Sequence, residues 1–132
     1  SAVSFKESDS SSSSDSGNGS MVSYAMQFLG NRYVWGGTSL TNGTDCSGFT
    51  MGIYRHFGIS IPRTSAAQAS ASRIVKSSEV RPGDLFFYGS GHVSHVAMYI
   101  GGGKIIHASN ARDGIKISNA YYRKPLKIGR FS

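Results

Sequence analysis

The pattern of polar and apolar residues divides the chain into a polar start, a helical part and a strand-rich part. Residues 8–20 read S-D-S-S-S-S-S-D-S-G-N-G-S and contain no large apolar side chain. Such a segment has nothing to bury, so we expect residues 1–19 to be a flexible Ser-rich linker that follows an upstream part of a longer protein. We expect one folded domain over residues 20–132.

Apolar residues recur at helical spacing in the first half of this domain. One apolar stripe predicts a helix between Ser20, a candidate N-cap, and Gly30, a candidate stop. A second stripe predicts a helix over residues 46–57, ended by Gly58. A third helix, rich in small residues, is expected within residues 64–78.

Two glycines in the second predicted helix indicate close packing. Gly48 and Gly52 lie four residues apart, on one face. Each costs about 1 kcal/mol of helix stability relative to alanine. We therefore expect this helix to approach a neighbouring segment more closely than a side chain would allow.

From Pro82 onward the pattern changes to short apolar runs separated by turn signals such as R-P-G-D. Helices followed by a run of strands predict an α+β fold, with the helices packed on one face of a meandering antiparallel sheet. The expected strands lie in L-F-F-Y (85–88), H-V-A-M-Y-I (95–100), K-I-I-H-A (104–108), G-I-K-I-S (114–118) and P-L-K-I-G-R-F (125–131).

The net charge of the chain limits the classes of partner that it is expected to bind. Fourteen Lys and Arg against seven Asp and Glu give a formal net charge of +7. This charge favours anionic partners, such as the acidic polymers of a bacterial wall, or it only keeps the surface soluble. The basic residues are scattered, so we expect no nucleic acid partner. No apolar run approaches the length of about 20 residues that spans a bilayer, and no signal peptide is visible.

The candidate chemistry starts at Cys46, the only cysteine of the chain. A helix start stabilises a thiolate by only about 0.3–1 kcal/mol, which is less than one pKa unit. An ionised Asp45 next to it opposes that effect. A reactive Cys46 therefore needs a histidine partner. On the residues alone, an inert buried thiol and a zinc ligand remain open as alternatives.

Two of the four histidines flank a hairpin signal. His95 and His107 lie on either side of G-G-G at 101–103. Their separation is an even number, so they share a face of the hairpin, either directly opposite each other or diagonal. This pair would supply a base and an orienting group for the thiol. His56 lies at the far end of the predicted cysteine helix, and His92 is expected at the rim of the cleft.

Six short motifs follow one another along the chain. They are R-Y-V-W-G-G (32–37), D-C-S-G-F (45–49), I-P-R-T-S-A-A-Q (61–68), R-P-G-D-L-F-F (81–87), H-V-A-M-Y-I-G-G-G (95–103) and I-I-H-A-S (105–109). In this order they resemble the NlpC-type bacterial cell-wall cysteine peptidases, which have a papain-like α+β fold, and the resemblance covers nearly everything from about residue 20 to the C-terminus. It implies a secreted or wall-associated endopeptidase, without cofactor or metal, that acts as a monomer on peptidoglycan stem peptides at the bond from γ-D-glutamate to a diamino acid.

The resemblance assigns catalytic roles to four positions. Cys46 matches the nucleophile, His95 the base and His107 the third, polar residue. Tyr33 matches a tyrosine near the oxyanion, and its alternative interpretation is a core aromatic.

Four further residues match positions near the substrate. Asp45, Ser47 and Ser65 correspond to residues that help to bind the free amine of the stem peptide. Trp35 is expected to be a wall of the cleft or a packing residue. Some relatives also use residues of an upstream wall-binding domain for this amine.

Two other classes of function stay open from the sequence. One is a different reaction on the same fold, either an N-acetylmuramoyl-L-alanine amidase or a transacylase. The other is a wall-binding module without turnover.

Overall fold

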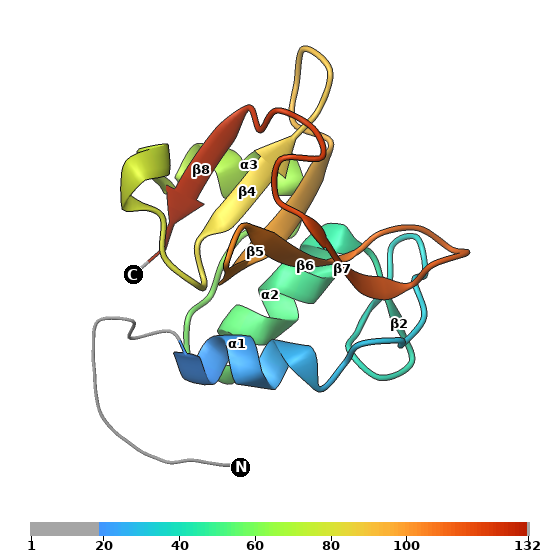
Figure 1. The fold of residues 1–132 in the computed structure, drawn as a ribbon. Helices are drawn as coiled ribbons and strands as arrows, with labels where there is room; N and C mark the ends of the chain where they lie inside the picture. Colours follow the sequence, from blue (N-terminus) through green and yellow to red (C-terminus); the bar gives the residue numbers. More distant parts are fainter. Residues whose placement is uncertain (1–18, 132) are drawn as a thin grey trace.

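Three helices lie on one side of a six-stranded antiparallel sheet in the computed structural model, which describes residues 19–131 (Figure 1). The expected linker therefore lies outside the described residues, apart from Gly19. The elements in chain order are α1 (Gly19–Met26), β1 (Thr38–Ser39), β2 (Gly43–Thr44), α2 (Cys46–His56), α3 (Ser65–Ala71), β3 (Arg73–Ile74), a 3-10 turn η1 (Ser77–Glu79), β4 (Leu85–Tyr88), β5 (His95–Gly101), β6 (Lys104–Ala108), β7 (Ile115–Asn119) and β8 (Lys127–Arg130).

The large sheet has the strand order β3-β8-β4-β5-β6-β7. The predicted meander is confirmed for β4 to β7, where each strand pairs with the next. The last strand returns to the other edge of β4, where Leu85 pairs with Gly129. Figure 1 shows β8 beside β4, at the opposite side of the sheet from β7. The four-strand meander brings both predicted histidine strands to the centre of the sheet.

The helix boundaries differ from the sequence prediction at two places. Helix α1 begins at Gly19 and ends at Met26, so Ser20 lies inside it and Gly30 lies four residues beyond its end. Backbone bonds between residues three apart replace the helical ones there, and the Gly30 N–H donates to the Ile115 carbonyl of β7. Helix α3 is shorter than expected, because the chain becomes extended at Ser72.

The large sheet is packed on both of its faces. On one face, α2 contributes Phe49 and Ile53, both fully buried, to a cluster with residues from the sheet and from the other two helices. A smaller cluster covers the opposite face of the sheet and includes Phe86, Tyr88 and Ile105. Burial on both sides holds the sheet and α2 in a fixed relation.

The prediction of close packing at the two helical glycines is confirmed. A Cβ at Gly48 would lie 2.4 Å from the Gly37 carbonyl oxygen, and one at Gly52 would lie 3.1 Å from Leu40. The β1–β2 hairpin therefore sits directly on the first turns of α2. This contact fixes the backbone around Cys46.

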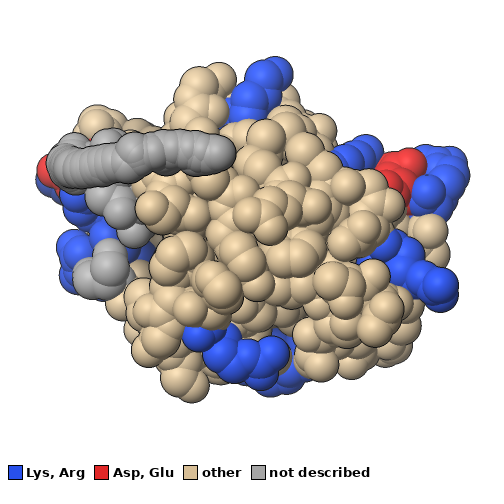
Figure 2. All heavy atoms as spheres, turned by 90° about the horizontal axis from the view of Figure 1, so that it is seen from below, with Lys and Arg blue, Asp and Glu red and all other residues tan. Residues whose placement is uncertain are grey.

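The surface carries its positive charge in separate places. Figure 2 shows one face, on which Lys and Arg side chains lie around the edge and uncharged residues fill the centre. None of the helices within residues 19–131 combines the length and the apolar character needed to cross a bilayer.

Candidate functional site

Cys46 is the first residue of α2 and is partly buried against the core. Burial raises the pKa of the Cys46 thiol, a backbone hydrogen bond from Val96 opposes that rise, and the charge of Asp45 adds to it. Val96 follows His95 in β5, so the thiol lies at the start of the histidine strand. The helix start does not ionise this thiol, and its reaction requires a base.

The two predicted histidines form a direct pair. His95 Nε2 lies 2.7 Å from His107 Nδ1, with the two rings nearly perpendicular at 72°. Tyr99 pairs with Ile105, so the hairpin is centred on Gly102 and the histidines are diagonal neighbours on one face. The shared face was predicted, and the register selects the diagonal arrangement.

Ser118, which the sequence did not indicate as a site residue, extends this pair. His107 Nε2 lies 2.9 Å from the hydroxyl oxygen of Ser118, in β7. If His107 donates to Ser118, its Nδ1 accepts a hydrogen bond from the N–H of His95 Nε2, and His95 Nδ1 is then free to act as a base. The alternation in I-K-I-S puts Ser118 on the face of His107, but only the β6–β7 register brings them together.

Both imidazoles are neutral near pH 7. Burial, followed by the charge of Arg123, lowers the pKa of His95 to about 4. Burial, followed by the neighbouring His95, lowers the pKa of His107 to about 3. A neutral His95 can accept the proton of a neutral thiol when the substrate binds.

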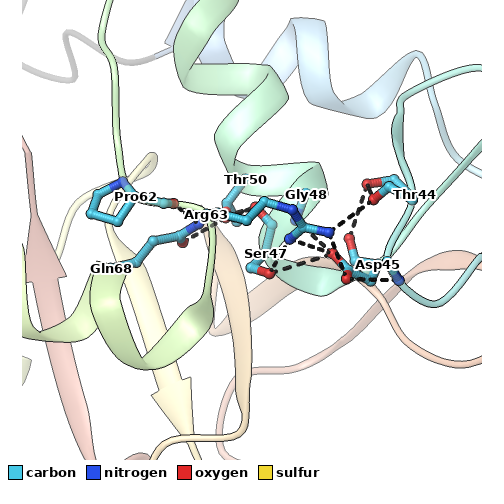
Figure 3. A network of polar contacts seen from close by, with 10 residues as sticks. Thr44, Asp45, Ser47, Gly48, Thr50, Pro62, Arg63 and Gln68 are labelled. Atoms are coloured by element: carbon cyan, nitrogen blue, oxygen red, sulfur yellow. Dashed lines mark hydrogen bonds and ion pairs between the residues drawn. The ribbon is translucent and has the colours of Figure 1, made fainter.

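Asp45 caps helix α2, which begins at Cys46, and is paired with a cation. Its carboxylate accepts hydrogen bonds from the backbone N–H groups of Gly48 at 2.8 Å and Gly36 at 3.1 Å. The Arg63 guanidinium donates to both carboxylate oxygens, at 3.1 and 2.9 Å (Figure 3). Burial alone would raise the pKa of Asp45, but the bonds from Arg63 and Gly48 outweigh it and lower that pKa. Asp45 is therefore an anion beside the thiol.

Arg63 is a second residue of this site that the sequence did not indicate, although it lies inside the motif I-P-R-T-S-A-A-Q (61–68). It also donates to the Ser47 hydroxyl at 2.8 Å, and 37% of its side chain is exposed. Its charge thus links the two residues that flank Cys46 and still faces solvent. An arginine just before the third expected helix was a weak signal, because its partners Asp45 and Ser47 lie at the start of another helix.

A buried glutamine holds the Arg63 segment to α2 (Figure 3). The Gln68 amide nitrogen donates to the carbonyl oxygens of Ser47 at 3.0 Å and Pro62 at 2.9 Å. Its oxygen accepts from the Thr50 hydroxyl at 2.8 Å. Both N–H bonds of the Gln68 side-chain amide have an acceptor. Gln68 therefore fixes the distance between α2 and the segment that carries Arg63.

The remaining predicted site residues surround this network. The pKa of Tyr33 is raised by burial and then by the charges of Cys46 and Asp45, so its hydroxyl lies near both. Trp35 is 86% exposed and contributes little to the core. Ser65 is buried as the first residue of α3.

The two other histidines lie outside this arrangement. His56 stacks on Tyr24 with ring centroids 3.8 Å apart, at the C-terminal end of α2. His92 is exposed in the loop between β4 and β5. Within residues 19–131, His, Cys, Asp and Glu side chains nowhere gather in a group of three that a metal ion could bind.

Comparisons with known proteins show the family to which the chain is similar. The family model described as "NlpC/P60 family" matches residues 30–128. "Probable endopeptidase p60" of Listeria innocua is 43% identical over 103 residues, which are 76% of this chain and 21% of that protein. "Gamma-D-glutamyl-L-lysine dipeptidyl-peptidase" of Bacillus cereus is 44% identical over 101 residues, which are 74% of this chain and 30% of that protein.

A solved structure has the same fold at domain scale. The NlpC/p60 domain of the peptidoglycan hydrolase SagA superposes with a TM-score of 0.77 at 36% identity, over 86% of this chain and 99% of that domain. The chain thus matches a complete domain, while it spans less than a third of the curated relatives given above.

Proposed function

Because the chain belongs to the NlpC/P60 family, we propose that it is a cysteine endopeptidase that cuts peptidoglycan stem peptides at the γ-D-glutamyl bond to a diamino acid. The observation that carries this proposal is that Cys46, at the start of α2, contacts the backbone of Val96 next to His95, and that His107 lies 2.7 Å from His95. The names of the similar proteins support the substrate class.

In the acylation step, Cys46 attacks the carbonyl carbon of the scissile amide. His95 takes the thiol proton on its free nitrogen as the S–C bond forms, and then gives that proton to the leaving amine as the C–N bond breaks. We assign the stabilisation of the oxyanion to the N–H of Cys46, at the open end of α2, and to the Tyr33 hydroxyl.

In the deacylation step, water attacks the thioester. His95 accepts a proton from the water as the new C–O bond forms, and the proton returns to the departing Cys46 sulfur. His107 holds the His95 ring during both proton transfers through their 2.7 Å hydrogen bond, and its own bond to Ser118 keeps the direction of donation.

The Asp45–Arg63 pair offers both charges that the acyl part of a stem peptide needs. A γ-linked D-glutamate keeps a free carboxylate, and a stem cut from the sugar has a free amine. Arg63 can bind the first, while Asp45 with Ser47 and Ser65 can bind the second. Because Arg63 already neutralises Asp45, the amine must share that carboxylate with Arg63. Asp45 therefore binds a free N-terminus more weakly than an unpaired carboxylate would.

We place this activity at the bacterial wall, outside the cell. The net charge of +7 is suited to attraction by anionic wall polymers, and salt should weaken that attraction. Trp35, exposed beside Gly36, then forms an aromatic wall for the incoming peptide.

Digestion of purified peptidoglycan, followed by mass spectrometry of the fragments, tests the proposal. We expect fragments that end at D-glutamate and fragments that begin with the diamino acid, and we expect neither from Cys46→Ala. Intact stems with a free L-alanine amine would identify an amidase instead. Binding to insoluble wall without any released fragment would identify a wall-binding module.

A further inference from the structure

The loop after β7 is fixed on the sheet next to the histidines. The Tyr88 hydroxyl donates to the Ala120 carbonyl oxygen at 2.7 Å. The Tyr121 ring packs edge-on against Phe86 at 5.7 Å, and the Tyr122 ring lies 5.3 Å from that of Tyr88. Two aromatic contacts and a buried hydrogen bond thus hold this loop in one position.

This position brings Tyr122 and Arg123 to the histidine pair. The Tyr122 ring centroid lies 6.1 Å from that of His107, and Tyr88 lies 6.1 Å from His95. The Arg123 guanidinium carbon lies 6.0 Å from the centre of the Tyr88 ring. Tyr122 remains 47% exposed and Arg123 is exposed, so both are accessible to a ligand.

Arg123 has no anionic partner among residues 19–131. Arg63, Arg112 and Arg130 each pair with a carboxylate, whereas the Arg123 guanidinium contacts only the face of an aromatic ring. Its charge nevertheless reaches His95 and adds to the effect of burial in lowering the pKa of that base.

An unpaired cation at this place disfavours catalysis. His95 must become positively charged when it takes the thiol proton, and a nearby guanidinium opposes that charge. An anion bound to Arg123 would remove this opposition at the moment of reaction. The position of Arg123 is therefore compatible with catalysis if the substrate supplies the anion.

The anion must belong to the leaving part of the substrate. Asp45 and Arg63 adjoin the Cys46 side of the site, where the acyl part becomes bound to sulfur. His95 passes its proton to the leaving amine, so the leaving part lies on the histidine side, where Tyr122 and Arg123 are.

We propose that Arg123, placed by Tyr88 and flanked by Tyr122, is a subsite for a free carboxylate on the amino-acid portion released by cleavage. This inference rests on the proposed peptidase function. Two parts of a stem peptide supply such a carboxylate: the main-chain terminus of a stem that ends at the diamino acid, and the side chain of diaminopimelate. Tyr122 would cover the aliphatic part of the diamino acid.

Three synthetic peptides test the subsite. The first is L-Ala-γ-D-Glu-L-Lys with a free α-carboxylate, and the second is the same peptide as its α-carboxamide. The third carries meso-diaminopimelate with an α-carboxamide and a free side-chain carboxylate. The measurement is kcat/KM for each peptide with the wild type, Arg123→Gln, Arg123→Lys and the control Arg55→Gln. Arg55 has the same charge but lies in the last turn of α2, at the opposite end from Cys46.

We expect the wild type to prefer at least one carboxylate peptide over the carboxamide lysine peptide by about tenfold, the usual size of a charged hydrogen bond. Arg123→Gln should abolish this preference, Arg123→Lys should retain part of it, and Arg55→Gln should leave it unchanged. Because the preference is a ratio within one enzyme, changes in the basicity of His95 cancel. The first and third peptides identify which carboxylate is bound.

Equal kcat/KM for all three peptides with the wild type, or a preference that persists in Arg123→Gln, would overturn the subsite and leave the peptidase function standing. If the wild type cleaves none of the peptides and releases no stem fragments from peptidoglycan, both proposals fail.

Discussion

The 2.7 Å contact between His95 Nε2 and His107 Nδ1 decides which nitrogen of His95 can act as a base. A proton on Nε2 satisfies this contact and leaves Nδ1 free for the thiol. His107 Nε2 lies 2.9 Å from the Ser118 hydroxyl oxygen, and we assign His107 as the donor in this contact. The direction of hydrogen-bond donation from β5 through β6 to β7 therefore sets the tautomer of His95.

Removal of the last hydroxyl should impair turnover without affecting binding. We expect Ser118→Ala to lower kcat by about tenfold, because one hydrogen bond of about 1–1.5 kcal/mol no longer favours the productive tautomer. KM should change little, and Ser118→Thr should keep most of the activity. Steady-state kinetics on a synthetic stem peptide checks this, and a wild-type kcat in Ser118→Ala would contradict the assigned direction of donation.

The buried histidines should make stability depend on pH. Their pKa values, about 4 for His95 and about 3 for His107, lie below the ordinary 6.5, so the unfolded chain binds protons first as the pH falls from 7 to 4. The free energy of unfolding should therefore fall over this range, by at most about 1.4 kcal/mol per pH unit for each histidine.

Urea unfolding at a series of pH values measures this slope, and His107→Gln should reduce it. Asp45 acts in a different window: its lowered pKa gives stability that is lost only as the pH falls below its ordinary value of 3.8. Equal slopes for the wild type and His107→Gln between pH 7 and 4 would show that His107 titrates normally.

Asp45 should hold back the ionisation of the neighbouring thiol. Its charge adds to burial in raising the pKa of Cys46, so Asp45→Asn should lower that pKa and speed alkylation by iodoacetamide near pH 7. We expect the alkylation rate to rise about threefold. Asp113→Asn makes the same change in net charge on the β6–β7 loop and should leave the rate unchanged. A rate in Asp45→Asn that matches this control would show that the Asp45 charge does not act on Cys46.

The Gln68 amide should matter more for stability than any exposed amide. Gln68→Leu leaves the Thr50 hydroxyl without its glutamine acceptor and removes donors from the carbonyl oxygens of Ser47 and Pro62. We expect a loss of about 2–4 kcal/mol in the free energy of unfolding, since buried polar groups lose their partners.

Gln27→Leu is the matched control, because Gln27 is the other glutamine of the chain and lies exposed after α1. It should change the free energy of unfolding by less than about 0.5 kcal/mol. Chemical denaturation of both variants makes the comparison, and similar losses for the two would contradict the role given to Gln68.

The sequence by itself determined the α+β class, the cysteine helix and the hairpin that carries both histidines. These features depend on local rules: apolar spacing, glycine turns and the alternation of side chains along strands. Alternation alone put His95 and His107 on one face, whatever the register. The two glycines of α2 likewise predicted close contact with a neighbouring segment, although they did not identify that segment.

Only the tertiary structure decided which groups act on these residues. Ser118 reaches His107 through the register of a further strand, and Arg63 reaches Asp45 from a segment eighteen residues away. Arg123 reaches the histidines because a loop is pinned by Tyr88. Burial of the imidazoles also arises only when the sheet and helices close around them, and no local pattern encodes it. The sequence therefore singled out Cys46 and the histidine pair, while packing between distant segments set the protonation and the charged neighbours of these residues.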